Sequence, residues 1–200
     1  IQLWANQSLN STWLVSHWSS EIPLDIRSAL KNMNEFECPV KLKTVKEVTI
    51  SFAAELNKQG HLNPTQPSFL YCYLPTQIDY GFPFLVNTDF LLNADRSALL
   101  DNAWNGFLLQ TIAIAHFVWL KDLAQNPSLG DQILWLLAPS KIRSPYLNLM
   151  STYSNGFLTG KEEVAFIPSA FDRTRLLKIK ECIVDQTEFF QAFPTVSDER

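Results

Sequence analysis

The chain is poor in the residues that catalytic and metal-binding motifs use. Its 200 residues include only six glycines, three histidines and three cysteines. The sequence contains no Gly-x-Ser-x-Gly turn and no His-Glu-x-x-His helix, so serine-hydrolase and zinc-protease chemistry has no support. The three cysteines lie far apart and no pair has zinc-ligand spacing, which predicts free thiols in a reducing compartment. We therefore expect no metal site in this chain.

Charge and long apolar runs are also scarce. Charged residues make up 18% of the chain and the net charge is −4, which argues against a nucleic-acid binder. The most apolar stretch, residues 112–120, is too short to span a bilayer. The first five residues lack the pattern of a secretory signal, so we expect a cytoplasmic protein without a membrane anchor. Because the sequence starts at Ile1 and not at Met, we also expect that it is a piece of a longer protein.

One segment superficially resembles a phosphate-binding loop. Residues 156–161 read GFLTGK, but the first glycine is one position too close to the second. Glu162 also stands where a serine or threonine would hold magnesium. We interpret the segment as a surface hairpin turn, so the chain should have no nucleotide cradle of its own.

What the sequence does contain is the pattern of an α+β protein. With 46% hydrophobic residues, it has enough apolar surface for a packed core. Alternation predicts a strand over residues 48–56, and helical spacing predicts a long helix over residues 97–124. Apolar runs predict strands at 69–74, closed by Pro75, and at 84–92, and residues 3–18 are typical of one or two strands. A short helix is expected after Pro23.

The pattern is weaker in the last third of the chain. Short helices are expected at residues 131–137 and 144–153, strands at 164–167 and 179–184, and a docked helix at 189–193. We therefore divide the chain into a domain over residues 1–125 and a smaller C-terminal α/β extension over residues 126–200 that packs on it.

Arg96 occupies an unusual place in this scheme. It lies between the predicted strand at 84–92 and the predicted helix from residue 97, with Asn93 and Asp95 as candidates for turn and N-cap chemistry. A cation at the positive end of a helix is unfavourable by roughly a few tenths of a kcal/mol. We therefore expect the Arg96 guanidinium to have a partner that offsets this cost. Two arrangements fit: the guanidinium pairs with Asp95 or Asp101, or it reaches outward to an anion, most simply a phosphate.

The residues around Arg96 resemble a known motif. Residues 87–97 read NTDFLLNADRS. The run resembles the catalytic-loop region in the middle domain of the ninety-kilodalton heat-shock chaperone family. Over residues 36–125 the chain is similar to sacsin-like proteins and their bacterial relatives with a chaperone-type ATPase domain. The segments that carry this resemblance are residues 38–43, 74–76, 82–84, 87–97 and 104–105.

The resemblance implies a middle or transducer domain with a left-handed β-α-β crossover around a long helix, placed after a nucleotide-binding domain in the parent chain. Arg96 would be the catalytic arginine that reaches the terminal phosphate of ATP. Arg96 and Asn93 would form the nucleotide-contacting loop, which Asn93 shapes. ATP and magnesium would be held by the upstream domain, so the parent is expected to be an ATPase while this segment alone is not an enzyme. Protein clients and a homodimer are compatible with the family.

The motif also departs from the heat-shock pattern, because Asp95 and Ser97 stand where that family has Ser and Glu around its arginine. Asp95 could hold Arg96 back when no nucleotide is present, or form a purely structural pair with it. The alternative function is therefore a non-catalytic protein–protein interaction scaffold that keeps only the fold. Aromatic residues would then form its binding patch: Phe82, Phe84, Trp135 and the cluster at 189–193.

Overall fold

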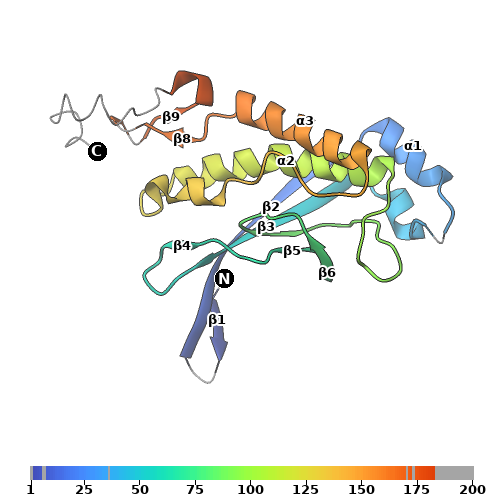
Figure 1. Ribbon diagram of the computed structural model, residues 1–200, viewed down its shortest axis with the longest axis horizontal. Helices are drawn as coiled ribbons and strands as arrows, with labels where there is room; N and C mark the ends of the chain where they lie inside the picture. Colours follow the sequence, from blue (N-terminus) through green and yellow to red (C-terminus); the bar gives the residue numbers. More distant parts are fainter. Residues whose placement is uncertain (1, 6–7, 36, 170, 173, 183–200) are drawn as a thin grey trace.

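A computed structural model of the chain describes residues 2–5, 8–35, 37–169, 171–172 and 174–182. It shows an α+β fold with a mixed sheet and three α-helices (Figure 1). The main sheet has the order β1-β2-β3-β7-β5-β6, with β4 paired to β3, and only β5 and β7 run parallel. Its strands are β1 (Gln2–Ala5), β2 (Ser8–Glu21), β3 (Glu47–Leu56), β4 (Leu62–Asn63), β5 (Phe69–Cys72), β6 (Leu74–Asp79) and β7 (Leu85–Asn87).

The helices lie together on one side of this sheet in Figure 1, with α3 alongside α2. The α-helices are α1 (Leu24–Asn32), α2 (Ala103–Ala124) and α3 (Leu147–Glu163), and the short 3₁₀ helices are η1 (Val40–Thr44), η2 (Gly130–Leu136) and η3 (Ile179–Glu181). β8 (Ile167–Pro168) and β9 (Leu176–Leu177) pair with each other in a separate small sheet. Within the described residues, α2 therefore leads to no strand that returns to the main sheet, so the expected β-α-β crossover is not formed there.

The strand predicted at 48–56 is confirmed as β3, and its alternation sets the core. Val48, Ile50, Phe52 and Ala54 are buried, while the residues between them are half-buried or exposed. Phe52 stacks on Trp119 of α2 at a centroid distance of 5.2 Å, which fixes the helix against the sheet. The predicted strand region at 3–18 corresponds to β1 and β2, and the helix expected after Pro23 is α1.

Phe82 and Phe84 belong to this core. Their side chains are 1% and 0% exposed, so they cannot form the surface patch considered for a scaffold. Phe82 stacks on Phe84, and Phe84 also stacks on His116 of α2. Trp135, in contrast, is 56% exposed, and residues 189–193 lie outside the described residues.

The strand predicted at 69–74 ends earlier, and a further strand was missed. β5 stops at Cys72, the chain turns at Tyr73, and β6 runs back from Leu74 to Asp79. Pro75 suggested a strand end, but β6 lies at the edge of the sheet, where a residue without an N–H group is tolerated. The strand predicted at 84–92 is also shorter, because β7 ends at Asn87.

Helix α2 is longer than the apolar stretch seen in the sequence. Among the described residues it is the one helix whose length and mean hydropathy of 1.3 would allow it to cross a membrane. Of that apolar segment, 56% is buried by the rest of the chain, as in the core helix of a globular domain. The packing thus covers just over half of this segment, and Phe107, Ile114, Val118 and Leu123 stay partly exposed.

The hairpin predicted at 156–161 is wrong, because these residues lie inside α3. A Cβ atom added at Gly156 would lie 2.6 Å from the carbonyl oxygen of Gln110, and one at Gly160 would lie 2.5 Å from Cδ2 of Phe117. Both glycines therefore allow α3 to approach α2 closely. The short helix predicted at 131–137 is η2, and the helix predicted at 144–153 extends to Glu163.

The strands predicted near the C-terminus are only partly present. β8 overlaps the predicted strand at 164–167, whereas residues 179–181 form η3 where a strand was expected. Buried residues from Ile22 to Phe166 form one hydrophobic cluster, so the core continues across the boundary placed at residue 125.

Candidate functional site

Arg96 lies in the loop of residues 88–102 that joins β7 to α2. The helix starts at Ala103, not at residue 97, and Asn102 caps it by accepting a hydrogen bond of 2.9 Å from the backbone N–H of Asn105. Arg96 is therefore not at a helix N-terminus, and Asn93 and Asp95 do not cap α2. Leu99 instead turns back to pair with Leu92, although its apolar character fits the helical period.

Three polar side chains stabilise this loop in place of a helical turn. Oδ1 of Asn93 accepts from the N–H of Ala98 at 2.9 Å, and its Nδ2 donates to Ser97 Oγ at 3.0 Å. Oδ1 of Asp95 accepts from both Oγ and N of Ser97, at 2.7 and 3.1 Å, which lowers the pKa of Asp95. Such side chain–backbone bonds compete with helix formation, which explains the late start of α2. Both polar atoms of the Asn93 side chain are thus bound within the loop.

The guanidinium of Arg96 binds backbone carbonyls of the β5–β6 turn. Nη2 donates to the oxygens of Leu74 and Cys72 at 2.8 and 3.1 Å, and Nε donates to that of Pro75 at 3.4 Å. The carbonyl of Arg96 in turn accepts from the N–H of Gln77 at 3.0 Å. The arginine therefore connects the loop to the edge strand β6 through both its side chain and its backbone.

Neither aspartate considered as a partner pairs with Arg96. Asp95 is bound to Ser97, and Asp101 accepts a hydrogen bond of 3.3 Å from Asn148 of α3. The single ion pair among the described residues joins Lys178 and Glu163. The positive charge of Arg96, which is half-buried, is therefore solvated by neutral carbonyls and not balanced by a carboxylate of the described chain.

The turn that receives Arg96 is itself unusual. Tyr73 has a φ of 61°, in the left-handed region, and its N–H donates to Oδ1 of Asn87 in β7 at 2.9 Å. Its side chain is 75% exposed and that of Leu74 is 66% exposed. The neighbouring Asp89 carboxylate raises the pKa of this tyrosine. Two exposed, largely apolar side chains, Tyr73 and Leu74, thus lie in the turn that the Arg96 guanidinium binds.

Asn105 is a supporting residue whose role sequence reasoning missed. It is fully buried in the first turn of α2, where Nδ2 donates to the carbonyls of Leu91 and Leu100 at 2.7 and 2.8 Å. Its Oδ1 accepts from the N–H of Leu91 at 3.0 Å, and the neighbouring Trp104 donates from Nε1 to the backbone carbonyl of Asp89 at 2.7 Å. These bonds hold the loop at both ends. The Trp-Asn pair formed part of the family resemblance and was the signal available for this role.

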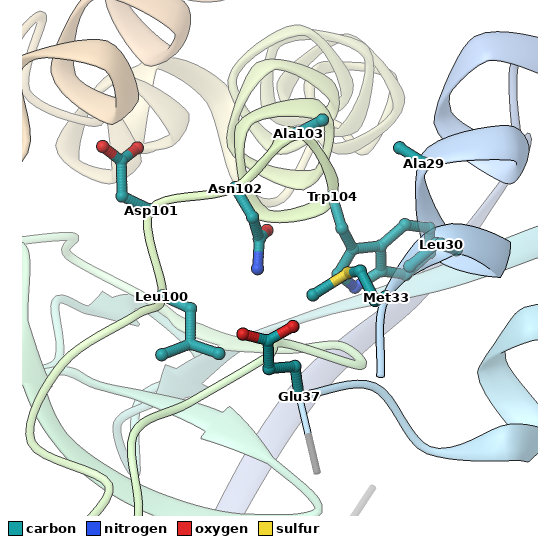
Figure 2. A pocket seen from close by; sticks show the side chains of 9 residues that line it. All are labelled: Ala29, Leu30, Met33, Glu37, Leu100, Asp101, Asn102, Ala103 and Trp104. Carbon is teal, nitrogen blue, oxygen red and sulfur yellow. The ribbon is translucent and has the colours of Figure 1, made fainter. Parts of the chain in front are cut away.

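A pocket of about 390 Å³ lies where α1 meets the start of α2 (Figure 2). Leu30, Met33, Leu100 and Trp104 form apolar walls, and the Glu37 carboxylate points into the space. No basic side chain lines it among the described residues. Because a phosphate requires cations or several converging N–H donors, this pocket does not suit the phosphates of a nucleotide.

The remaining titratable groups offer no second site. Among the described residues, no group of three or more His, Cys, Asp or Glu side chains is arranged to hold a metal. His116 is fully buried in α2, Nε2 lies 2.9 Å from the carbonyl oxygen of Leu136, and desolvation lowers its pKa to about 4. It is therefore a neutral core residue.

Comparisons with known proteins were made at three levels. A scan against models of protein families, a search of curated proteins and a search of solved structures each found no match to this chain. The Arg96 loop and the motif around it are therefore the features of this chain on which a functional proposal can rest.

Proposed function

We propose that the chain is the middle or transducer domain of a cytoplasmic, chaperone-like ATPase of the heat-shock and sacsin-like type. In this proposal Arg96 contacts the terminal phosphate of ATP held, with magnesium, by an upstream nucleotide-binding domain. The observation that carries the proposal is a guanidinium in a loop at the sheet edge, without a carboxylate partner among the described residues.

The chemistry of the guanidinium fits this role. The bonds from Arg96 to the carbonyls have a charge on the donor only, whereas a phosphate adds negative charge on the acceptor and can accept two parallel N–H bonds from one guanidinium, so it can compete with the three neutral carbonyls. Positive charge placed on the transferred phosphoryl group stabilises the transition state, and an arginine in this position accelerates transfer by about 10³-fold or more. The exposed neighbours Tyr73 and Leu74 place the guanidinium at an accessible edge of the domain.

Asn93 supports the proposal indirectly. Both polar atoms of its side chain are bound inside the loop, so its contribution is to set the backbone from which Arg96 extends. The loop ends are fixed by Asn105, and the order of elements places the loop at the edge strand β6. Arg96 thus extends from a loop that is braced on both sides while its own side chain is free to exchange partners.

One observation favours the alternative, a non-catalytic interaction scaffold. The three carbonyls bound to Arg96 are enough to explain the arginine as a brace for the β5–β6 turn. In that case the exposed Tyr73 and Leu74, together with Trp135, are the candidate contacts for a partner protein.

The two functions are separated by ATP turnover of the complete protein that carries this chain. We expect Arg96→Ala to lower the turnover rate by about 10²-fold or more while ATP affinity stays within a few-fold of wild type. Arg143→Ala, which removes an exposed arginine outside the loop, is the matched control and should retain wild-type turnover. A folded Arg96→Ala variant with unchanged turnover would contradict the transducer role and favour the scaffold.

A further inference from the structure

The strained backbone of the described chain is concentrated at one contact. Tyr73 and Arg96 are the two described non-glycine residues with positive φ, each at 61°. Nη2 of Arg96 binds the carbonyl oxygens of Cys72 and Leu74, the residues on either side of Tyr73. A single nitrogen therefore draws together the two carbonyls that flank the left-handed tyrosine.

The conformation of Tyr73 is fixed from the opposite side as well. Its N–H is bound to Asn87 of β7, and the backbone of Arg96 is bound to Gln77 of β6. A bulky L-residue is unfavourable in the left-handed region, because Cβ approaches the following carbonyl oxygen. The β5–β6 pairing and the bond to Asn87 hold Tyr73 in this conformation together with the bonds from Arg96, so the turn loses part of its support and should loosen when the guanidinium leaves.

We propose that Tyr73 is a positioning residue for Arg96: its strained turn holds the guanidinium in a weakly favoured resting position, from which a phosphate can withdraw it. Withdrawal of the guanidinium would break its bonds to the carbonyls of residues 72, 74 and 75 and loosen the turn at Tyr73, while the β5–β6 pairing keeps the chain reversed there. The exposed Tyr73–Leu74 turn would then change shape with nucleotide state. This inference rests on the proposed function, because it requires an anion that Arg96 can bind.

Two variants isolate the backbone strain. Tyr73→Gly and Tyr73→Ala both remove the ring, but only glycine adopts a φ of 61° without a steric penalty. Glycine should therefore stabilise the resting position of Arg96. We expect turnover of ATP by the complete protein to be about fivefold lower for Tyr73→Gly than for Tyr73→Ala, with a higher thermal midpoint for the glycine variant. In the Arg96→Ala background the difference in ATP turnover between the two variants should disappear.

Hydrogen exchange provides the second readout. A non-hydrolysable ATP analogue should speed exchange at the amides of Tyr73 and Gln77 by several-fold in the complete protein, and this response should be absent in Arg96→Ala. Equal turnover of the two Tyr73 variants and unchanged exchange, with turnover still lost in Arg96→Ala, would overturn this inference and leave the proposed function intact. Full turnover in Arg96→Ala would instead contradict the proposed function.

Discussion

Two regions of this molecule keep their shape by different means. At the α2–α3 interface, Gly156 and Gly160 lie so close to α2 that a methyl group added at either position has no space, and aromatic rings pack beside them. At the edge formed by β5, β6 and the loop before α2, polar side chains bind backbone groups, and two residues adopt left-handed conformations. Close packing stabilises the first region, and hydrogen bonds between side chains and backbone groups stabilise the second.

This difference separates the packing contacts of the core from the loop to which we assign the proposed function. A close-packed interface has few alternative arrangements, so its residues contribute to stability. A loop braced by side chain–backbone bonds, with a cation held only by neutral carbonyls, can change partners without disturbing the core. Substitutions in the first region should lower the free energy of unfolding, whereas those in the second should mainly change the position of Arg96.

The largest effect is expected at the glycines of α3. Gly160→Ala places Cβ 2.5 Å from Cδ2 of the buried Phe117 ring and 3.2 Å from Cα of Ile114, so the ring or the two helices must shift. We expect the free energy of unfolding to fall by about 3 kcal/mol or more, measured by urea denaturation. Gly106→Ala is the matched control, because its Cβ would meet only Thr152 at 3.8 Å; it should raise stability by about 0.5–1 kcal/mol. Equal effects at the two sites would refute the close-packing account.

Asn105→Ala should have the next largest effect, because it links the two regions. Removing the amide leaves the N–H of Leu91 and the carbonyl of Leu100 without these buried partners. We expect a loss of about 3 kcal/mol in unfolding free energy and faster hydrogen exchange across residues 91–100. A stability loss without any change in exchange in this loop would show that Asn105 does not position it.

The buried histidine predicts a pH dependence of stability. His116 has a folded-state pKa of about 4 against 6.5 in the unfolded chain, so the unfolded state binds more protons between these values. Stability should therefore fall as pH decreases from about 6.5 to 4, and His116 accounts for about 2 kcal/mol of the loss between pH 7 and pH 5. His116→Gln should remove this contribution, while His61→Gln, at an exposed position, should not. If the unfolding free energy of His116→Gln falls with decreasing pH as steeply as that of the wild type, the buried histidine is not the cause.

The smallest stability effect is expected at the candidate site itself. Lysine has one nitrogen and cannot replace both the Nη2 and the Nε donors with which Arg96 reaches three carbonyls, so Arg96→Lys should loosen the β5–β6 turn. Because the side chain is only half-buried, we expect a loss of about 1 kcal/mol or less by denaturation. A loss as large as that of Gly160→Ala would mean that Arg96 is primarily a structural residue.

The elements with strong periodicity could be predicted from the sequence. Strand β3 and helix α1 were found because alternation and a proline start are local signals. The start of α2 could not be found in this way, because the residues before it fit a helical period while Asn93 and Asp95 bind the loop backbone. Residues 156–161 were misread because glycine serves both turns and close helix packing, and only the tertiary contact with α2 distinguishes them.

The candidate site was predictable only in part. The motif around Arg96 singled out the residue, and the side chain of Asn93 does shape the loop. The partners of Arg96 were not predictable, since they are backbone carbonyls of a turn about twenty residues earlier in the chain. Every residue carries a backbone carbonyl, so the pattern of side chains in the sequence does not indicate which carbonyls Arg96 binds. The left-handed conformation of Tyr73 was equally hidden, because tyrosine is a residue type that rarely adopts it.

The most direct test is a crystal structure of the complete protein in the presence of ADP and beryllium fluoride, which would occupy the proposed nucleotide site. We predict that the Arg96 guanidinium has left the carbonyls of Cys72 and Leu74 and lies within hydrogen-bond distance of the phosphate mimic. A guanidinium that remains on these carbonyls, with no residue of this chain near the bound nucleotide, would contradict the transducer role and establish Arg96 as a brace of the turn.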